Sequence, residues 1–236
     1  MTPRMSSRRR QAPEGLQAAF PLRRMKSLRG SRRLAREKVL QIFAAATAAQ
    51  VPWDTVFEHI FYRDFTVDIP TPVRPLLTPE ELQEVEADTP IHWEEDELRF
   101  ARQLLEAAER FREVAAEALC NVLQHWDIER LVPIDRLILQ LGIAEMLAFP
   151  QTPVPVVIDE AVELAKKYST EHSGQFVNGV LEAAYYWLVE RGLRAPSPEM
   201  RPRTAQEALQ AFELPQGYNA EVFHTLPGSS GQGSSQ

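Results

Sequence analysis

Apolar residues recur at helical spacing along most of the chain, and the spacing predicts a series of helices separated by proline-containing turns. The first predicted helix follows Ser31, whose hydroxyl suits an N-cap, and runs through RRLAREKVLQIFAAATAAQ. Its apolar face is formed by Leu34, Ala35, Val39, Leu40, Ile42 and Phe43. Val51-Pro52 ends it, and a short helix from Trp53 to about Phe61 is expected next.

Two more helices are predicted between residues 78 and 124. The run Thr78-Pro79-Glu80-Glu81 is typical of a helix start, because Thr caps, Pro suits the first position and the acids meet the positive end of the dipole. That helix is short and ends near Ala87. A long helix is expected from about Trp93 to about Gln124, with apolar residues at core spacing.

Three further helices are predicted in the second half of the chain. The first lies within 126–147, with Asp127 as its cap. The second opens at Val154-Pro155 and ends in Lys166-Lys167, which suits the negative end of a helix. The last runs from about Gln175 to Arg191, with Gly192 as its C′ residue.

No segment alternates between apolar and polar residues for long enough to predict a strand. The sequence therefore predicts an all-α fold, a compact bundle of about seven helices. Residues 1–30 are predicted to be a basic, disordered extension, and residues 31–192 the helical domain. Residues 193–236 are expected to be a mostly disordered tail, with one or two helical turns at 205–212.

Charge is distributed very unevenly along the chain. Residues 1–38 carry a net charge of +10 and the remaining residues −17, although the whole chain is only −7. A basic arm on an acidic body is a common arrangement for contact with nucleic acid. An arginine-rich start is also typical of organelle transit peptides, and the true start could lie at Met25, so these interpretations stay open.

Composition and motifs exclude several classes of protein. The single cysteine, Cys120, cannot form an internal disulfide, and its apolar neighbours predict an inert core or interface residue. No apolar run is long enough to span a membrane. Phosphate-binding glycine motifs and zinc-ligand spacings are absent, so neither an enzyme nor a cofactor or metal is expected.

An acidic cluster at Asp159, Glu160 and Glu163 could be imagined as a general acid–base site. The favoured interpretation is that these residues line the outer face of an amphipathic helix, where the dipole stabilises them.

The strongest functional candidates are Arg32, Arg33 and Arg36 at the start of the first helix. Cations there oppose the helix dipole, and a local conflict of this kind is typical of a functional site. Guanidinium groups bind phosphate bidentately and stack on unpaired bases, which favours single-stranded RNA. The alternatives are a solvated charge run or part of a targeting peptide.

A second candidate is the segment from Ser173 to Leu181. Phe176 lies in the first helical turn after a polar loop, where an aromatic residue is either part of the core or a stacking platform for a base. Spacing alone favours the core.

Four stretches resemble the NusB family: SRRLAREKVLQIF at 31–43, IDRLIL through IAEML within 134–147, VPVVIDEAVELAKKY at 154–168, and FVNGVL at 176–181. The resemblance covers roughly residues 31–190, and residues 50–92 match weakly and look enlarged. It implies two packed helical subdomains and a cytoplasmic transcription antitermination factor. In this family the protein pairs with NusE, a ribosomal protein, and binds boxA RNA of nascent ribosomal transcripts.

The resemblance also implies roles for individual residues. Arg32, Arg33 and Arg36 match the arginines of the RNA-binding helix, and Phe176 matches an aromatic residue at the RNA surface. His172 lies where an acid is common, which would alter RNA affinity or its pH response. The region used for NusE or adjacent RNA contains Glu129, Asp135 and Arg136. An alternative function is a helical protein-interaction module in ribosome assembly that binds RNA only weakly.

Overall fold

The computed structural model of the chain describes residues 28–62, 91–123 and 131–211. They belong to two compact units, Met1–Gly30 with Asp64–Trp93, and Ser31–Arg63 with Glu94–Gln236. In the first unit, strand β1 (Leu28–Arg29) pairs in parallel with β2 (Ile91–His92). These strands were not predicted, because two residues are too few to show an alternating pattern. The second unit is called the helical body below.

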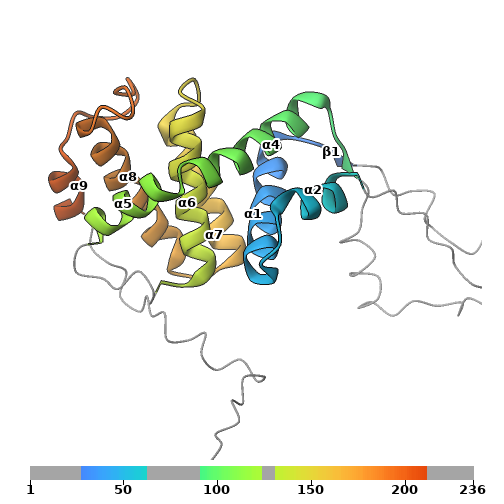
Figure 1. Ribbon diagram of the computed structural model, residues 1–236. Helices are drawn as coiled ribbons and strands as arrows, with labels where there is room; N and C mark the ends of the chain where they lie inside the picture. The colour runs from blue at the N-terminus through green and yellow to red at the C-terminus, as the bar shows by residue number, and fades with distance from the viewer. Residues whose placement is uncertain (1–27, 63–90, 124–130, 212–236) are drawn as a thin grey trace, which may run out of the picture. The chain divides into compact units, whose positions relative to one another are not determined.

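The described part of the helical body contains eight helices and no strand (Figure 1). They are α1 (Arg32–Ala49), α2 (Trp53–Phe61), α4 (Glu95–Arg110), α5 (Arg112–Val122), α6 (Pro133–Ala148), α7 (Val154–Tyr168), α8 (Ser173–Glu190) and α9 (Ala205–Ala211). The predicted all-α fold is confirmed. The helix predicted at 78–87 and the cap at Asp127 lie outside the described residues. None of the described helices combines the length and apolar character needed to cross a membrane.

Helix α1 begins and ends close to where the sequence predicts. The Ser31 hydroxyl accepts a hydrogen bond from the amide of Leu34 at 3.2 Å, which satisfies one of the amides that a helix start leaves without a partner. Gln50, in the left-handed conformation with φ 54°, ends the helix. The predicted apolar face packs against α2, α4 and α6 and is buried, except for the half-buried Leu34.

Helix α6 lies in the middle of the helical body, where it contacts α1, α4, α5, α7 and α8 (Figure 1). It is apolar around most of its circumference, as expected for a helix covered on several sides. At Gly142 the backbone comes so close to α8 that an added Cβ would lie 3.0 Å from the side chain of Leu181.

The long helix predicted from Trp93 to Gln124 is in fact two helices. Phe111, with φ −101° and ψ 16°, separates α4 from α5. α4 packs against α1, whereas α5 packs against α8. The apolar spacing continues through the break, but the change of direction at Phe111 buries its two halves against different helices. Cys120 on α5 is exposed, which excludes the core alternative of its predicted place as a core or interface residue.

The chain beyond α8 is packed further than the sequence predicts. Gly192 has φ 67°, which confirms it as the C′ residue of α8. Residues 193–211 then return along α8 and are held by two tyrosines. The hydroxyl of Tyr185 accepts from the amide of Ser197 at 2.7 Å, and that of Tyr186 donates to the carbonyl of Arg201 at 2.6 Å. Residues 193–211, expected to be mostly disordered, therefore form an ordered strap that ends in α9, where the sequence predicts one or two helical turns. Residues 212–236 lie outside the described residues.

Candidate nucleic-acid interface

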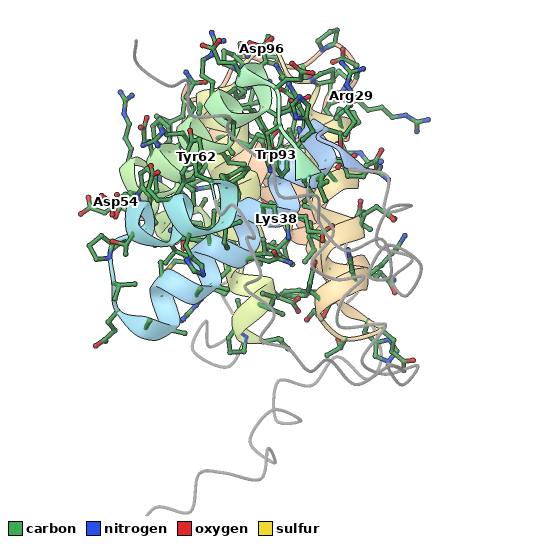
Figure 2. All side chains as sticks on the ribbon, turned by 90° about the vertical axis from the view of Figure 1, so that its right-hand side faces the viewer. Arg29, Lys38, Asp54, Tyr62, Trp93 and Asp96 are labelled. Atoms are coloured by element: carbon green, nitrogen blue, oxygen red, sulfur yellow. The ribbon has the colours of Figure 1, made fainter. Side chains whose placement is uncertain are left out.

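Arg32 and Arg33 are exposed at the start of α1 (the blue helix of Figure 1), as the sequence predicts for RNA contacts. Figure 2 views the side of the helical body where α1, α2 and the start of α4 lie, with Lys38, Asp54 and Asp96 marking these helices. The guanidinium of Arg32 lies over the ring of Phe100 on α4, 5.2 Å from its centroid. This cation–π contact orients Arg32 without neutralising its charge.

Arg33 contacts α7 through a carboxylate. Its Nε and Nη2 atoms donate to Oε1 of Glu160 at 3.1 and 2.8 Å. The hydrogen bond and the negative charge of Glu160 raise the pKa of Arg33 above its ordinary value. Arg33 is thus both exposed and ion-paired within the protein.

Arg36 is buried, which corrects its prediction as a direct RNA contact. Its Nε and Nη2 atoms donate to the two oxygens of Glu145 on α6, at 2.8 and 2.5 Å, in a bidentate ion pair. The guanidinium also lies 5.1 Å from the centroid of Phe100. A polyanion in solution cannot reach this group, so Arg36 has a structural role.

Four charges of alternating sign connect the core to the surface. Nη1 of Arg36 lies 3.8 Å from Oε2 of Glu160, so Glu160 bridges Arg36 and Arg33. The exposed fraction of the side chain rises along this row, from 4% at Glu145 through 9% at Arg36 and 13% at Glu160 to 67% at Arg33. We call these four residues the charge row. Only its last member faces solvent.

A second set of contacts joins α1 to the end of α7. Oε1 of Glu37 accepts hydrogen bonds from Nζ of Lys167 at 2.8 Å and from the hydroxyl of Tyr168 at 2.7 Å. The side-chain amide of Gln41, one turn further along α1, donates a hydrogen bond to the hydroxyl of Tyr168 at 3.0 Å. Burial opposes ionisation of Glu37, but the hydrogen bonds from Lys167 and Tyr168 lower its pKa below the ordinary value.

Between these contacts lies a cleft of about 340 Å³ on the surface of α1 and α7, which we call the α1–α7 cleft. Its charged lining residues are Arg33, Glu37, Glu160, Glu163, Lys166 and Lys167. The nearest acid to Lys166 is Glu163, whose Oε1 lies 2.8 Å from Nζ. Each cation of the cleft is therefore matched by a carboxylate.

Phe176 and His172 begin the next helix, α8, just after the end of α7. His172 is partly exposed, and its Nε2 lies 3.1 Å from Oε1 of Glu171. The ring of Phe176 is fully buried, so no base can stack on it, which corrects its prediction at the RNA surface. The first turn of α8 directs Phe176 toward the core, whereas its neighbour Gln175 is exposed and His172, just before the helix, is partly exposed.

The residues expected at the partner surface are separated by the fold. Asp135, in the first turn of α6, is fully buried and accepts a hydrogen bond from the hydroxyl of Ser173 at 2.7 Å. This bond ties the start of α6 to the start of α8, so Asp135 is structural. Arg136 is exposed and lines a hollow of about 390 Å³ together with Arg112 and Trp53. Glu129 lies outside the described residues.

The acidic cluster is divided among different neighbours. Asp159 is exposed, Glu160 holds Arg33, and Glu163 holds Lys166. Within residues 28–62, 91–123 and 131–211, no group of three or more His, Cys, Asp or Glu could hold a metal ion. The sequence did not reveal Phe100 as a residue of the site, nor the ion pairs of Glu160 and Lys167, because each of these contacts joins residues distant in the chain.

Comparison with known proteins places the chain in a family. The sequence model described as NusB family matches residues 77–185. A protein of Symbiobacterium thermophilum described as "Transcription antitermination protein NusB" is 35% identical over 151 residues, which cover 64% of this chain and 86% of that protein. This chain belongs to the NusB family.

Other NusB relatives match over shorter stretches. The "Transcription antitermination protein NusB" of Koribacter versatilis is 42% identical over 90 residues, which cover 38% of this chain and 62% of that protein. The chain thus matches less than two thirds of the length of several NusB relatives. A solved structure described as the crystal structure of a plectonemic RNA supercoil aligns with TM-score 0.50 and 25% identity, over 67% of this chain and 96% of that one.

Proposed function

We propose that this NusB-family chain is a cytoplasmic transcription antitermination factor. It binds single-stranded, boxA-type RNA of nascent ribosomal transcripts together with the ribosomal protein NusE. The observation that carries the proposal is the exposure of Arg32 and Arg33 at the start of α1, within the segment of residues 1–38 whose net charge is +10. The names of the NusB relatives support the antitermination role.

The proposed mechanism is electrostatic and involves no covalent chemistry. Arg32 and Arg33 neutralise phosphates and release the counterions condensed on the RNA. Such contacts fix the position of the strand but do not read its sequence. His172 and other exposed groups around the loop before α8 are the candidates for contacting bases, now that Phe176 is known to be buried.

Arg136 remains a candidate for the NusE surface. It is exposed beside Arg112 in a hollow that also contains the side chain of Trp53. Aromatic and arginine side chains are the residues that most often dominate the binding energy of protein interfaces. Asp135 contributes to this surface only indirectly, by holding the start of α6.

Fluorescence anisotropy with labelled boxA RNA, with and without purified NusE, tests the RNA contacts. The double variant Arg32→Glu/Arg33→Glu should weaken RNA binding at least about tenfold and reduce the slope of log affinity against log salt by about 1.4, for two lost phosphate contacts on a single strand. The matched control Arg110→Glu/Arg201→Glu changes the net charge equally at two exposed arginines outside the site. It should bind nearly as well as the wild type.

Equal RNA affinity of the first double variant and the wild type at physiological salt would show that the assigned surface is not the RNA site. If NusE binds the chain with an affinity that salt barely changes, and boxA RNA does not bind at all, a protein-interaction module is the better description.

A further inference from the structure

We propose that the α1–α7 cleft carries the RNA backbone onward from Arg33, with Lys167 as the next phosphate contact, and that Glu160 and Glu37 compete with phosphate for these two cations. The inference rests on the proposed function and extends its RNA site. It assigns a binding role to one cation and an affinity-limiting role to two acids.

Arg33 and Lys167 are accessible, whereas their carboxylate partners are largely buried. In the third ion pair of the cleft both side chains are exposed, Lys166 at 59% and Glu163 at 52%. The side chains of Arg33 and Lys167 are 67% and 58% exposed, and those of Glu160 and Glu37 are 13% and 17% exposed. The carboxylates therefore lie beneath the cations, and an anion arriving from solvent meets positive charge first. A guanidinium carries five N–H donors and an ammonium three, so the ion pairs occupy only part of the donor capacity of each cation.

The spacing of these contacts follows the axis of α1. Arg33 faces Glu160, and Glu37, four residues later, faces Lys167. Four residues correspond to about 6 Å along a helix. Gln41, a further turn along, contacts Tyr168 at the end of α7, and His172 follows four residues later in the chain. The cleft thus leads from the arginines of α1 toward the loop that contains His172, the two regions that the sequence singles out separately.

When a phosphate binds Arg33 or Lys167, it must replace the carboxylate of Glu160 or Glu37 that already pairs with that cation. In the free protein Glu160 already neutralises Arg33, and Glu37 already neutralises Lys167, so each phosphate gains less than it would at an isolated cation. Because the cation of each pair is exposed, water screens the interaction, and each ion pair is worth a factor of about five or less in affinity. The carboxylates therefore reduce RNA affinity without preventing binding, and the salt dependence of binding stays moderate.

The test measures binding of labelled boxA RNA, and of a poly-U strand of equal length, to single variants of the full chain. Glu160→Gln and Glu37→Gln should each tighten binding about twofold to fivefold, because the carboxylate charge is removed. Lys167→Gln should weaken binding by a similar factor and reduce the salt slope by about 0.7. Both RNAs should respond alike, since backbone contacts carry no sequence information.

Glu117→Gln and Arg191→Gln are the matched controls. These two residues form an exposed ion pair of 3.1 Å between α5 and α8, outside the cleft, and their removal should leave RNA affinity unchanged. A further control is Glu160→Gln in an Arg33→Gln background. Because Glu160 is expected to act through Arg33, its effect should disappear there. Thermal unfolding of each variant shows whether the fold is intact, and Glu37→Gln tests the inference independently if Glu160→Gln unfolds the chain.

Two results would overturn the inference while leaving the proposed function standing. One is weaker RNA binding by both Gln variants, which would mean that the carboxylates orient the cations rather than compete for them. The other is a Lys167→Gln variant that binds RNA as tightly as the wild type, while the separate Arg32→Glu/Arg33→Glu variant no longer binds RNA. A wild-type chain that binds neither RNA overturns both proposals.

Discussion

Three arginines within five positions of α1 have three different environments. Arg32 lies over an aromatic ring, Arg33 holds a carboxylate at the surface, and Arg36 is buried against Glu145. The sequence predicts one common role for all three, because it shows their residue type and helical position but not their partners. Glu145 is 109 residues from Arg36 in the chain, and only the packing of α6 against α1 brings the two together.

Arg36→Ala should reduce the free energy of unfolding by about 3–5 kcal/mol, because Glu145 would be left buried without its counterion. Urea unfolding measures the loss. The double variant Arg36→Met/Glu145→Leu removes both charges and should recover most of the stability. A variant Arg36→Ala of normal stability that has lost RNA binding would contradict the structural role given to this arginine.

The pH dependence of stability should contain a contribution from Glu37. Its pKa in the folded chain lies below the ordinary value of 4.5. The stabilisation from ionised Glu37 is therefore complete above about pH 5 and is lost as the pH falls through the folded pKa. Because this carboxylate is partly solvated, the contribution should be below about 1 kcal/mol. Unfolding free energies measured from about pH 6 to 3 should fall less steeply for Glu37→Gln than for the wild type. Parallel curves would refute this assignment.

At the scale of elements, the sequence is most informative where a helix has a start or stop signal of its own. The Ser31 cap, the proline at the start of α7 and Gly192 after α8 all lie where the sequence places a helix boundary. Helix α6 instead begins at Pro133, later than the predicted cap at Asp127. The break at Phe111 has no such signal, because its cause is tertiary: α4 and α5 pack on different neighbours. The burial of Phe176 agrees with its helical spacing, which favours the core, and it was the resemblance to the NusB family that placed this ring at the RNA surface.

The crossing of α6 and α8 depends on a small residue at Gly142. Gly142→Val should destabilise the chain by about 1–3 kcal/mol, because the added methyl groups must displace the fully buried side chain of Leu181. Ala148→Val, at a half-buried position of the same helix, controls for the lower helix propensity of valine. Thermal unfolding should separate the two variants. Equal melting temperatures of Gly142→Val and Ala148→Val would show that a valine side chain fits between α6 and α8 without displacing Leu181.

At the scale of the whole molecule, the strap of residues 193–211 ties α8 to the end of α6. Arg194 is buried and donates to the carbonyls of Met146, Phe149, Pro150 and Thr152, at the end of α6 and in the turn that follows. Its guanidinium thus satisfies carbonyls that the end of a helix leaves without partners. The sequence could not predict this role, because Arg194 is simply one cation in a segment rich in proline and charge.

Arg194→Lys should destabilise the helical body by about 2 kcal/mol or more, because a single ammonium cannot reach carbonyls spread over seven residues. Chemical denaturation measures the change. Arg191→Lys, at an exposed position three residues earlier, should have almost no effect. A similar loss in both variants would mean that positive charge near the end of α8, rather than the geometry of the guanidinium, matters here.

The charge row has a consequence for genetics. Its solvent-facing end takes its position from groups in the interior. For the proposed antitermination role, alleles that alter Glu145 should therefore emerge from a selection for loss of terminator read-through, although Glu145 is buried and lies outside the proposed RNA contacts. Such alleles would be temperature-sensitive, and second-site suppressors would map to Arg36 or Phe100 rather than to the transcript. Mutations clustered at Glu145, Arg36 and Phe100 would indicate a defect in packing, and these residues should not be counted among the RNA contacts.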